Sequence, residues 1–79
     1  MTNKEIIDII THLMCDVLDV TVLSINETTT ASDIDEWDSL NHAILISKIQ
    51  KEFKIKFKLK EVLKFNNVGD MCTAIKSKL

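Results

Sequence analysis

The stretch Glu36–Ser47, "EWDSLNHAILIS", contains the transition that decides the fold. An acidic segment ends at Asp38, and an apolar run with helical spacing begins directly after Ser39. Asp38 is a favourable N-cap, because its carboxylate accepts a free backbone N–H and suits the positive end of the helix dipole. We therefore expect a helix that begins at Asp38 or Ser39 and ends at Phe53. Its expected apolar face comprises Leu40, Ala43, Leu45, Ile46, Ile49 and Phe53, with Ile44 at the edge.

Capping signals and apolar spacing predict three further helices. Thr2 followed by Glu5 has the pattern of a capping box ahead of a long apolar stripe. Residues 59–65 indicate a short helix, and Asn67 with Asp70 three positions later begins a last long one. The predicted fold class is all-α: a four-helix bundle of three long helices and one short helix, with a long loop after the first helix.

Two segments have strand-like patterns instead. Residues 53–60, "FKIKFKLK", alternate apolar residues with lysine, and residues 20–25, "VTVLSI", are rich in β-branched residues. A ribbon of only two strands is marginally stable in water, so we expect residues 53–60 to form an extended connector. The connector residues expected to point at the core are Ile55, Phe57 and Leu59. The loop residues expected to turn inward are Val20, Val22, Leu23, Ile25 and Ile34.

Composition excludes several classes of protein. The chain has 79 residues, of which 46% are hydrophobic and 28% charged, and this suits one globular domain over residues 1–79. Proline is absent and glycine occurs once, which disfavours a sandwich or barrel of many short strands. No apolar run has the length of a membrane span, and the N-terminus lacks the pattern of a signal peptide. We therefore expect a cytoplasmic monomer without membrane insertion.

Charge is distributed unevenly along the chain. Residues 1–38 hold nine acids and one lysine, a charge of −8, whereas residues 39–79 hold nine lysines and three acids, a charge of +6, for a net −2. This pattern predicts an acidic side and a basic side. The lysines do not favour nucleic acid as a partner, because arginine is absent and the net charge is negative. A solvated face or a docking surface for an acidic enzyme is the better interpretation of these lysines.

The cysteines and histidines do not indicate a metal site. Cys15 and Cys72 lie far apart, each within an apolar helical stripe, and no CxxC pair or zinc-like histidine spacing occurs. Both thiols are expected to be reduced core residues, although spacing alone also permits one disulfide.

Ser39 has three interpretations. As a nucleophile it would act with His42 and Asp38, but so small a chain offers little room for an oxyanion hole and a water-excluding pocket. We instead expect His42 to pack against Trp37 across the helix start. As a capping serine Ser39 would have no chemical role. As an attachment point it would place a phosphate ester at the positive end of the helix, where free N–H groups stabilise negative charge.

The whole chain resembles the acyl carrier protein family and phosphopantetheine-binding carriers generally. The resemblance rests on Asp38-Ser39-Leu40, the DSL motif, on the following helix that ends in "KEFKIKF", and on the final stretch "NNVGDMCTAIKSKL". It covers almost all residues in order and length. It implies a bundle of the acyl-carrier type with no catalytic activity. Ser39 would receive 4'-phosphopantetheine from coenzyme A through a separate holo-synthase, which would also read Asp38 and Leu40.

The same resemblance implies a cargo and a set of partners. The arm on Ser39 would carry an acyl or aminoacyl group as a thioester, supplied by a loading ligase and passed to a downstream transferase or synthase. Glu36 and Trp37 stand where fatty-acid carriers usually have glycine and an aliphatic residue. The stretch "WDSLNH" is more similar to stand-alone bacterial carriers of specialised pathways, such as surface-polysaccharide or secondary-metabolite assembly.

The second helix also departs from the acidic helix of fatty-acid carriers. It carries Lys48 and Lys51 but only one acid, Glu52, and Ile44 occupies a position that is often acidic and exposed in the family. The residues expected to recognise partners are Trp37, Ile44, Lys48 and Lys51. The alternative is a carrier-like helical interaction module that is never modified, which would use the same surface to hold a protein partner.

Overall fold

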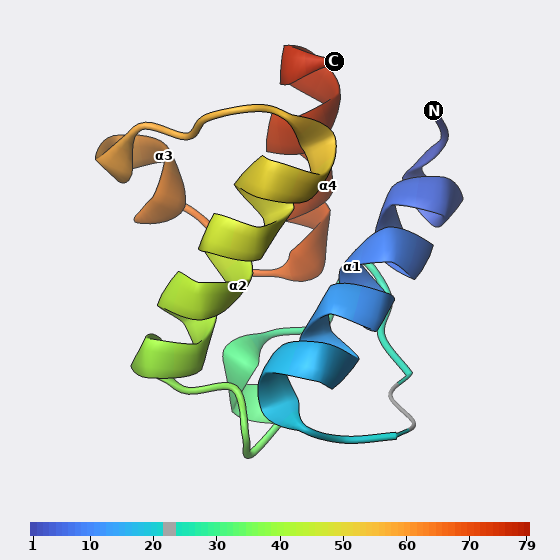
Figure 1. The fold of residues 1–79 in the computed structure, drawn as a ribbon, viewed down its shortest axis with the longest axis vertical. Helices are drawn as coiled ribbons and strands as arrows, with labels where there is room; N and C mark the ends of the chain where they lie inside the picture. The colour runs from blue at the N-terminus through green and yellow to red at the C-terminus, as the bar shows by residue number, and fades with distance from the viewer. Residues whose placement is uncertain (22–23) are drawn as a thin grey trace.

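The computed structural model describes residues 1–21 and 24–79, and over these residues it is helical without strands (Figure 1). The elements in chain order are α1 (Asn3–Leu18), the 3-10 turn η1 (Ala31–Asp33), α2 (Ser39–Phe53), α3 (Leu59–Val62) and α4 (Val68–Lys78). The prediction of three long helices and one short helix is confirmed. The short helix is a single turn, since α3 ends at Val62 instead of continuing to residue 65.

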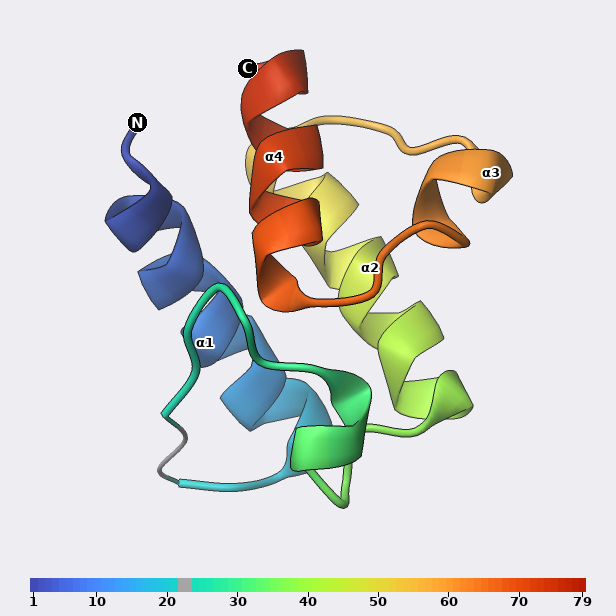
Figure 2. The same ribbon diagram turned by 180° about the vertical axis from the view of Figure 1, so that it is seen from behind.

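The three long helices form the bundle, and α3 stands to one side of it (Figures 1 and 2). Helix α1 packs against both α2 and α4. Both termini lie at one end of the bundle, and η1 lies at the opposite end, beside the start of α2 (Figure 2). The N-terminal end of α2 is therefore far from the ends of the chain.

The predicted caps are present at both α1 and α4. The Thr2 hydroxyl accepts the Glu5 N–H at 3.2 Å, and the Glu5 carboxylate accepts the Thr2 N–H at 2.8 Å. At α4, the Asn67 side-chain oxygen accepts the Asp70 N–H at 2.8 Å. These bonds satisfy N–H groups that have no acceptor within their own helix, and so they define where each helix begins.

The core is built from one face of each long helix and two residues of the long loop. Its buried members are Ile6, Ile10, Met14, Leu18, Ile34, Trp37, Leu45, Ile46, Ile49, Val68, Met71, Cys72 and Ile75. The inward placement predicted for Ile34 is confirmed, and Val20 and Ile25 pack partly buried against this cluster. The same prediction for Val22 and Leu23 lies outside the described residues. Burial of these side chains is the main favourable contribution to folding.

The apolar face of α2 differs from the predicted one. Leu40 is 70% exposed and Ala43 is exposed, so the prediction that both belong to the core is wrong. The buried residues of α2 are Leu45, Ile46 and Ile49. Position 40 is about 120–180° around the helix from each of these three residues, because successive residues turn by about 100°. The run of apolar residues after Ser39 thus supplies two faces, one inside and one outside.

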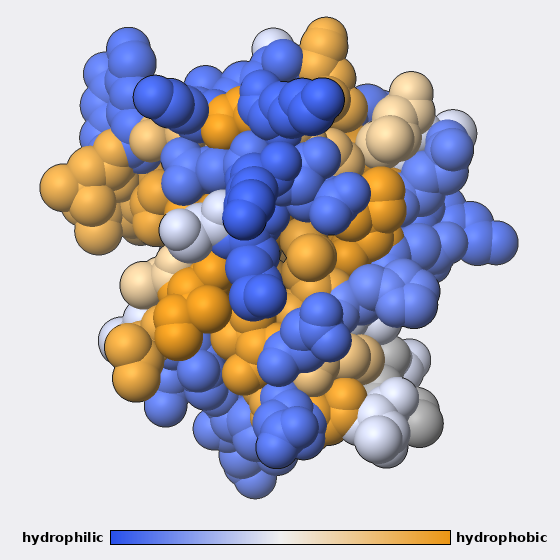
Figure 3. Space-filling view, viewed as in Figure 1, coloured by the Kyte–Doolittle hydropathy of each residue, from blue (hydrophilic) through white to orange (hydrophobic). Residues whose placement is uncertain are grey.

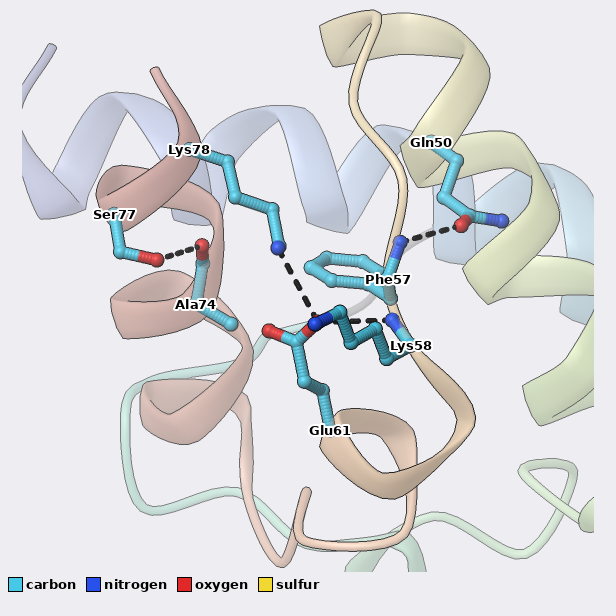
Figure 4. Close-up of polar contacts among 7 residues, drawn as sticks. All are labelled: Gln50, Phe57, Lys58, Glu61, Ala74, Ser77 and Lys78. Carbon is cyan, nitrogen blue, oxygen red and sulfur yellow. Dashed lines mark hydrogen bonds and ion pairs between the residues drawn. The ribbon is translucent and has the colours of Figure 1, made fainter.

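The connector after α2 is extended, as predicted, and hydrogen bonds hold it to the helices (Figure 4). The Phe57 N–H donates to the side-chain oxygen of Gln50 at 2.7 Å, and the Phe57 ring packs against the Phe65 ring with centroids 5.2 Å apart. Ile55 and Phe57 pack partly buried against the core, whereas Leu59 is 74% exposed. The inward placement predicted for Leu59 is wrong, because α3 begins at this residue and the period-two alternation stops there.

The long loop is fastened to the first turn of α4. The Val68 N–H donates to the Thr29 carbonyl at 2.9 Å, and the Gly69 N–H donates to the Glu27 carbonyl at 2.8 Å. A Cβ atom at Gly69 would lie 2.9 Å from the Glu27 carbonyl oxygen, a distance that ordinary packing does not allow. The one glycine of the chain therefore stands where two backbone segments touch.

The two cysteines are free thiols, as expected. Cys15 is half-buried and Cys72 is buried in the core, where loss of hydration raises the pKa of the Cys72 thiol to about 11. None of the helices in the described part of the chain combines the length and the apolar character needed to cross a bilayer.

Candidate functional site

Ser39 is the first residue of α2, and its side chain is exposed. The Asp38 carboxylate caps the helix by accepting the Asn41 N–H at 2.8 Å, as predicted. The Ser39 hydroxyl makes no hydrogen bond to any residue that the structure describes, and the backbone N–H groups of Ser39 and Leu40 have no acceptor among those residues. Asp38, not Ser39, is thus the helix cap, and the serine oxygen is accessible from solvent.

The turn before Ser39 is held by two further bonds. The His42 N–H donates to the Asp38 carbonyl at 2.8 Å, and the Asn41 side-chain amide donates to the Glu36 carbonyl at 2.8 Å. The Asn41 bond was not foreseen from the sequence, because an asparagine inside a helix does not indicate which carbonyl its amide will reach. Together these bonds fix the approach of the loop to the helix, and hence the position of the serine.

Trp37 is buried under the start of α2, with 5% of its surface exposed. Its indole Nε1–H donates to Nδ1 of His42 at 3.0 Å, and the two rings lie 5.7 Å apart between centroids. The predicted packing of His42 against Trp37 is confirmed. The expectation that Trp37 touches a partner directly does not fit this burial, which leaves the indole little surface for an intermolecular contact.

A cleft of about 440 Å³ adjoins Ser39, and we call it the Ser39 cleft. Its lining residues are Ala31, Trp37, Asp38, Ser39, His42, Phe65, Asn66, Asn67 and Met71. The members from the α3–α4 connection and from α4 could not be found from the sequence, because only the packing of the bundle brings them to the start of α2. The cleft offers a partly apolar surface within reach of a group attached to the serine.

Burial lowers the pKa of the His42 imidazole from its ordinary value, which favours the neutral form of the ring. Because Nδ1 accepts the Trp37 N–H, the proton of the neutral ring resides on Nε2. That nitrogen has no lone pair with which to take a proton from Ser39. The geometry therefore does not assemble the hydrolase arrangement considered from the sequence.

The outer face of α2 is apolar at its start and basic further along. Leu40 is 70% exposed and Ile44 is 40% exposed, while Lys48 and Lys51 are exposed one and two turns beyond Ile44. A shallow groove on this face is lined by Ala43, Ile44, Ser47, Lys48 and Lys51. Figure 3 shows apolar surface over the N-terminal half of α2 and over α3. Of the expected partner-recognition residues, all except Trp37 are thus brought together on one face.

Comparisons with known proteins agree with this arrangement. The family described as "Phosphopantetheine attachment site" matches residues 8–75. The solved structure of a holo acyl carrier protein from Geobacter metallireducens is 39% identical, with a TM-score of 0.83, and the alignment covers 90% of this chain and 82% of that one. A putative acyl carrier protein from Mycobacterium tuberculosis has the same fold at 24% identity, with a TM-score of 0.78 and coverage of 89% and 93%. No curated protein matches the chain in sequence.

The family match covers well over half of the chain, and the Geobacter protein is similar over nearly all of it. An accessible hydroxyl at a helix start, next to a cleft, is compatible with the prosthetic group that this family uses. The chain belongs to the acyl carrier protein family and is a non-catalytic carrier, whose covalently bound prosthetic group is 4'-phosphopantetheine.

Proposed function

We propose that Ser39 is the residue that bears the 4'-phosphopantetheine, within a single carrier domain formed by residues 1–79. The chain then presents an acyl or aminoacyl thioester to partner enzymes of a specialised biosynthetic pathway. The observation that supports this most is the exposed Ser39 hydroxyl, which makes no hydrogen bond to any described residue and belongs to the lining of the Ser39 cleft. The proposed location is the cytoplasm, because the two cysteines of the chain are free thiols, which suits a reducing compartment.

For the transfer of phosphopantetheine, the chain itself has to supply only the Ser39 hydroxyl oxygen as the nucleophile. Ser39 Oγ attacks the coenzyme A phosphorus that bears the pantetheine oxygen. The Oγ–P bond forms as the bond to adenosine 3',5'-bisphosphate breaks, and a base on the separate holo-synthase takes the hydroxyl proton. The resulting diester is negative, and the free N–H groups of Ser39 and Leu40 at the positive end of α2 favour that charge. The arm, once attached, supplies the thiol that carries the cargo.

The outer face of α2 is the proposed docking surface for the holo-synthase, the loading ligase and the downstream transferase or synthase. Ile44 supplies an exposed apolar anchor, and Lys48 and Lys51 supply positive charge. Among the described residues the one ion pair joins Lys78 to Glu61, so these two lysines remain free to meet carboxylates of a partner. A basic docking helix fits enzymes with an acidic surface, and such charge matching raises association rates.

The modification is tested by intact mass after incubation with coenzyme A and a purified holo-synthase of broad specificity. The expected result is one phosphopantetheinyl increment in the wild type and in Ser47→Ala, and none in Ser39→Ala. Ser47 is the matched control, because it is also an exposed serine of α2. An increment that persists in Ser39→Ala would place the group elsewhere. Absence of any increment with several transferases would favour the unmodified interaction module.

The docking surface is tested by the rate at which holo protein is loaded by an adenylating ligase of the pathway. Lys48→Glu with Lys51→Glu should lower kcat/KM by at least tenfold at low salt, and the deficit should shrink as salt rises. Lys4→Glu with Lys76→Glu, at exposed positions of α1 and α4, is the charge-matched control, because it changes the net charge by the same amount outside α2. Equal losses in both variants would mean that net charge, and not this face, governs loading.

A further inference from the structure

Nε2 of His42, in the Ser39 cleft, has no hydrogen-bond partner among the described residues. His42 Nδ1 accepts the Trp37 indole N–H at 3.0 Å, so the neutral ring must carry its proton on Nε2. No described residue accepts a hydrogen bond from Nε2, and this atom is not among the fully buried polar atoms. The buried indole therefore fixes the imidazole as an N–H donor whose second nitrogen remains accessible.

This donor belongs to the same cleft as the serine. Ser39 and His42 are separated by three positions on α2, which places their side chains on neighbouring parts of the helix surface. Side chains in a helix lean toward its N-terminus, so the imidazole leans toward Ser39. Both residues line the Ser39 cleft. Asp38 is the only other titratable residue among the described lining residues, and its carboxylate is occupied by the Asn41 N–H.

We propose that His42 donates its Nε2–H to the phosphodiester formed at Ser39, and that Trp37 holds the ring in the tautomer that makes this possible. His42 is then a positioning residue, which directs the first atoms of the arm over the cleft. The inference rests on the proposed attachment at Ser39. A diester oxygen is a strong acceptor, and the neutral Nε2–H satisfies it without placing a charged imidazolium in a half-buried position.

The experiment compares apo and holo protein by NMR, following the imidazole ¹⁵N signals and the ³¹P signal of the diester between pH 4 and 8. In the holo protein the His42 ring should remain an Nε2–H tautomer, with its Nε2 and attached proton shifted relative to the apo protein. The ³¹P shift should titrate with the same midpoint as His42. The pKa of His42 should be higher in the holo than in the apo protein, because the negative diester favours the imidazolium.

The molecule contains its own control. His12 is an exposed residue of α1 that does not line the Ser39 cleft, so its ring signals should not change when the arm is attached. In His42→Gln the side-chain amide can still donate but cannot titrate, so the ³¹P shift should stay near its wild-type value and become flat with pH. In Trp37→Phe the ring should populate both tautomers, and the ³¹P response should weaken.

Each outcome decides one of the two proposals. A ³¹P signal that titrates with His42 supports the hydrogen bond. A phosphopantetheinyl increment on Ser39 together with a ³¹P signal that ignores the His42 midpoint overturns the hydrogen bond and leaves the attachment intact. Absence of the increment overturns the attachment itself. The wild-type titration needs no substitution, so an unfolded variant cannot obscure the answer.

Discussion

Lys78 Nζ lies 3.2 Å from Oε1 of Glu61, and this ion pair joins the last turn of α4 to the single turn of α3 (Figure 4). The same carboxylate oxygen accepts the Lys58 N–H at 2.8 Å. The lysine ammonium also lies 5.9 Å from the centroid of the Phe57 ring. A helix of one turn has too few internal bonds to be stable alone, so these contacts hold α3 in place.

Removal of this pair should loosen α3 without unfolding the bundle. In Lys78→Met the amides of residues 58–63 should exchange faster, while the midpoint of global unfolding changes little, because the pair is partly exposed. Lys76→Met is the matched control on the same helix. Hydrogen exchange followed by NMR measures both effects. Unchanged protection of residues 58–63 in Lys78→Met would show that the pair is not what retains α3.

The same contacts predict a dependence on pH. The pKa of Glu61 is lowered from 4.5, chiefly by the Lys58 N–H and further by Lys78. A depressed carboxylate pKa contributes stability that is present above the unfolded value and is lost as pH falls through the folded value. We therefore expect the contacts of α3 to weaken as the pH falls through and below the ordinary glutamate range, with exchange at residues 58–63 accelerating before exchange of the core amides. Glu61→Gln should remove most of this dependence.

The Asp38 side chain caps α2, and this structural role can be tested separately from recognition of Asp38 by the holo-synthase. Asp38→Ala removes the hydrogen bond to the Asn41 N–H and should cost about 1 kcal/mol of unfolding free energy. Asp38→Asn retains a capping oxygen and should cost a few tenths of that amount. Urea unfolding measures both. If the holo-synthase reads the charge, modification of Asp38→Asn will be slow although the protein is stable. Equal rates for Asp38→Asn and wild type would restrict Asp38 to capping.

Gly69→Ala tests the junction between the long loop and α4. Alanine has the higher helix propensity by about 1 kcal/mol, but its Cβ would lie 2.9 Å from the Glu27 carbonyl oxygen. Backbone atoms yield less readily than side chains, so we expect a net loss of about 1–3 kcal/mol and weaker protection of the Val68 and Gly69 amides. Ser77→Ala, at an exposed position of α4, should change stability by about 0.5 kcal/mol or less. A stabilised Gly69→Ala would mean that the loop moves aside freely.

The Cys72 thiol should be unreactive in the folded protein. Its pKa is raised to about 11 by burial, so at pH 8 almost none of it is the nucleophilic thiolate. A disulfide reagent should therefore modify Cys15 first and Cys72 only on unfolding. In the holo protein the arm thiol should react fastest. Mass analysis after timed quenching distinguishes the sites, and rapid modification of Cys72 in native protein would show that the core opens easily.

Much of the architecture follows from local rules that are visible in the sequence. The caps at Thr2, Asp38 and Asn67 require only a side-chain oxygen and a nearby N–H, so residues three positions apart suffice to predict them. The DSL motif likewise identified Ser39 as the candidate attachment point. Pairing of His42 with Trp37 was also foreseen, because five positions across a helix start bring two rings into contact.

Features that depend on packing between distant segments were not predictable. Leu40 and Leu59 have the composition of core residues, yet both are exposed, because the rotation of α2 and the start of α3 are set by neighbouring helices. The contribution of Phe65 and Met71 to the Ser39 cleft also could not be predicted, because it depends on how the helices pack together. The tautomer of His42 depends on one hydrogen-bond direction, which no spacing rule encodes.

The fastening of the long loop to α4 has a mechanical consequence for the Ser39 cleft. On one side, the long loop that leads to Ser39 is hydrogen-bonded to α4 through the carbonyls of Glu27 and Thr29. Two further residues of this loop, Ile34 and Trp37, are buried in the core. On the other side, the segment leading into Asn66 follows the single turn of α3, whose residues are exposed or half-buried and which a partly exposed ion pair joins to α4. If bulky cargo enters the Ser39 cleft, the wall formed by the long loop should keep its position. The α3 segment should move instead, and the cleft should widen by its displacement.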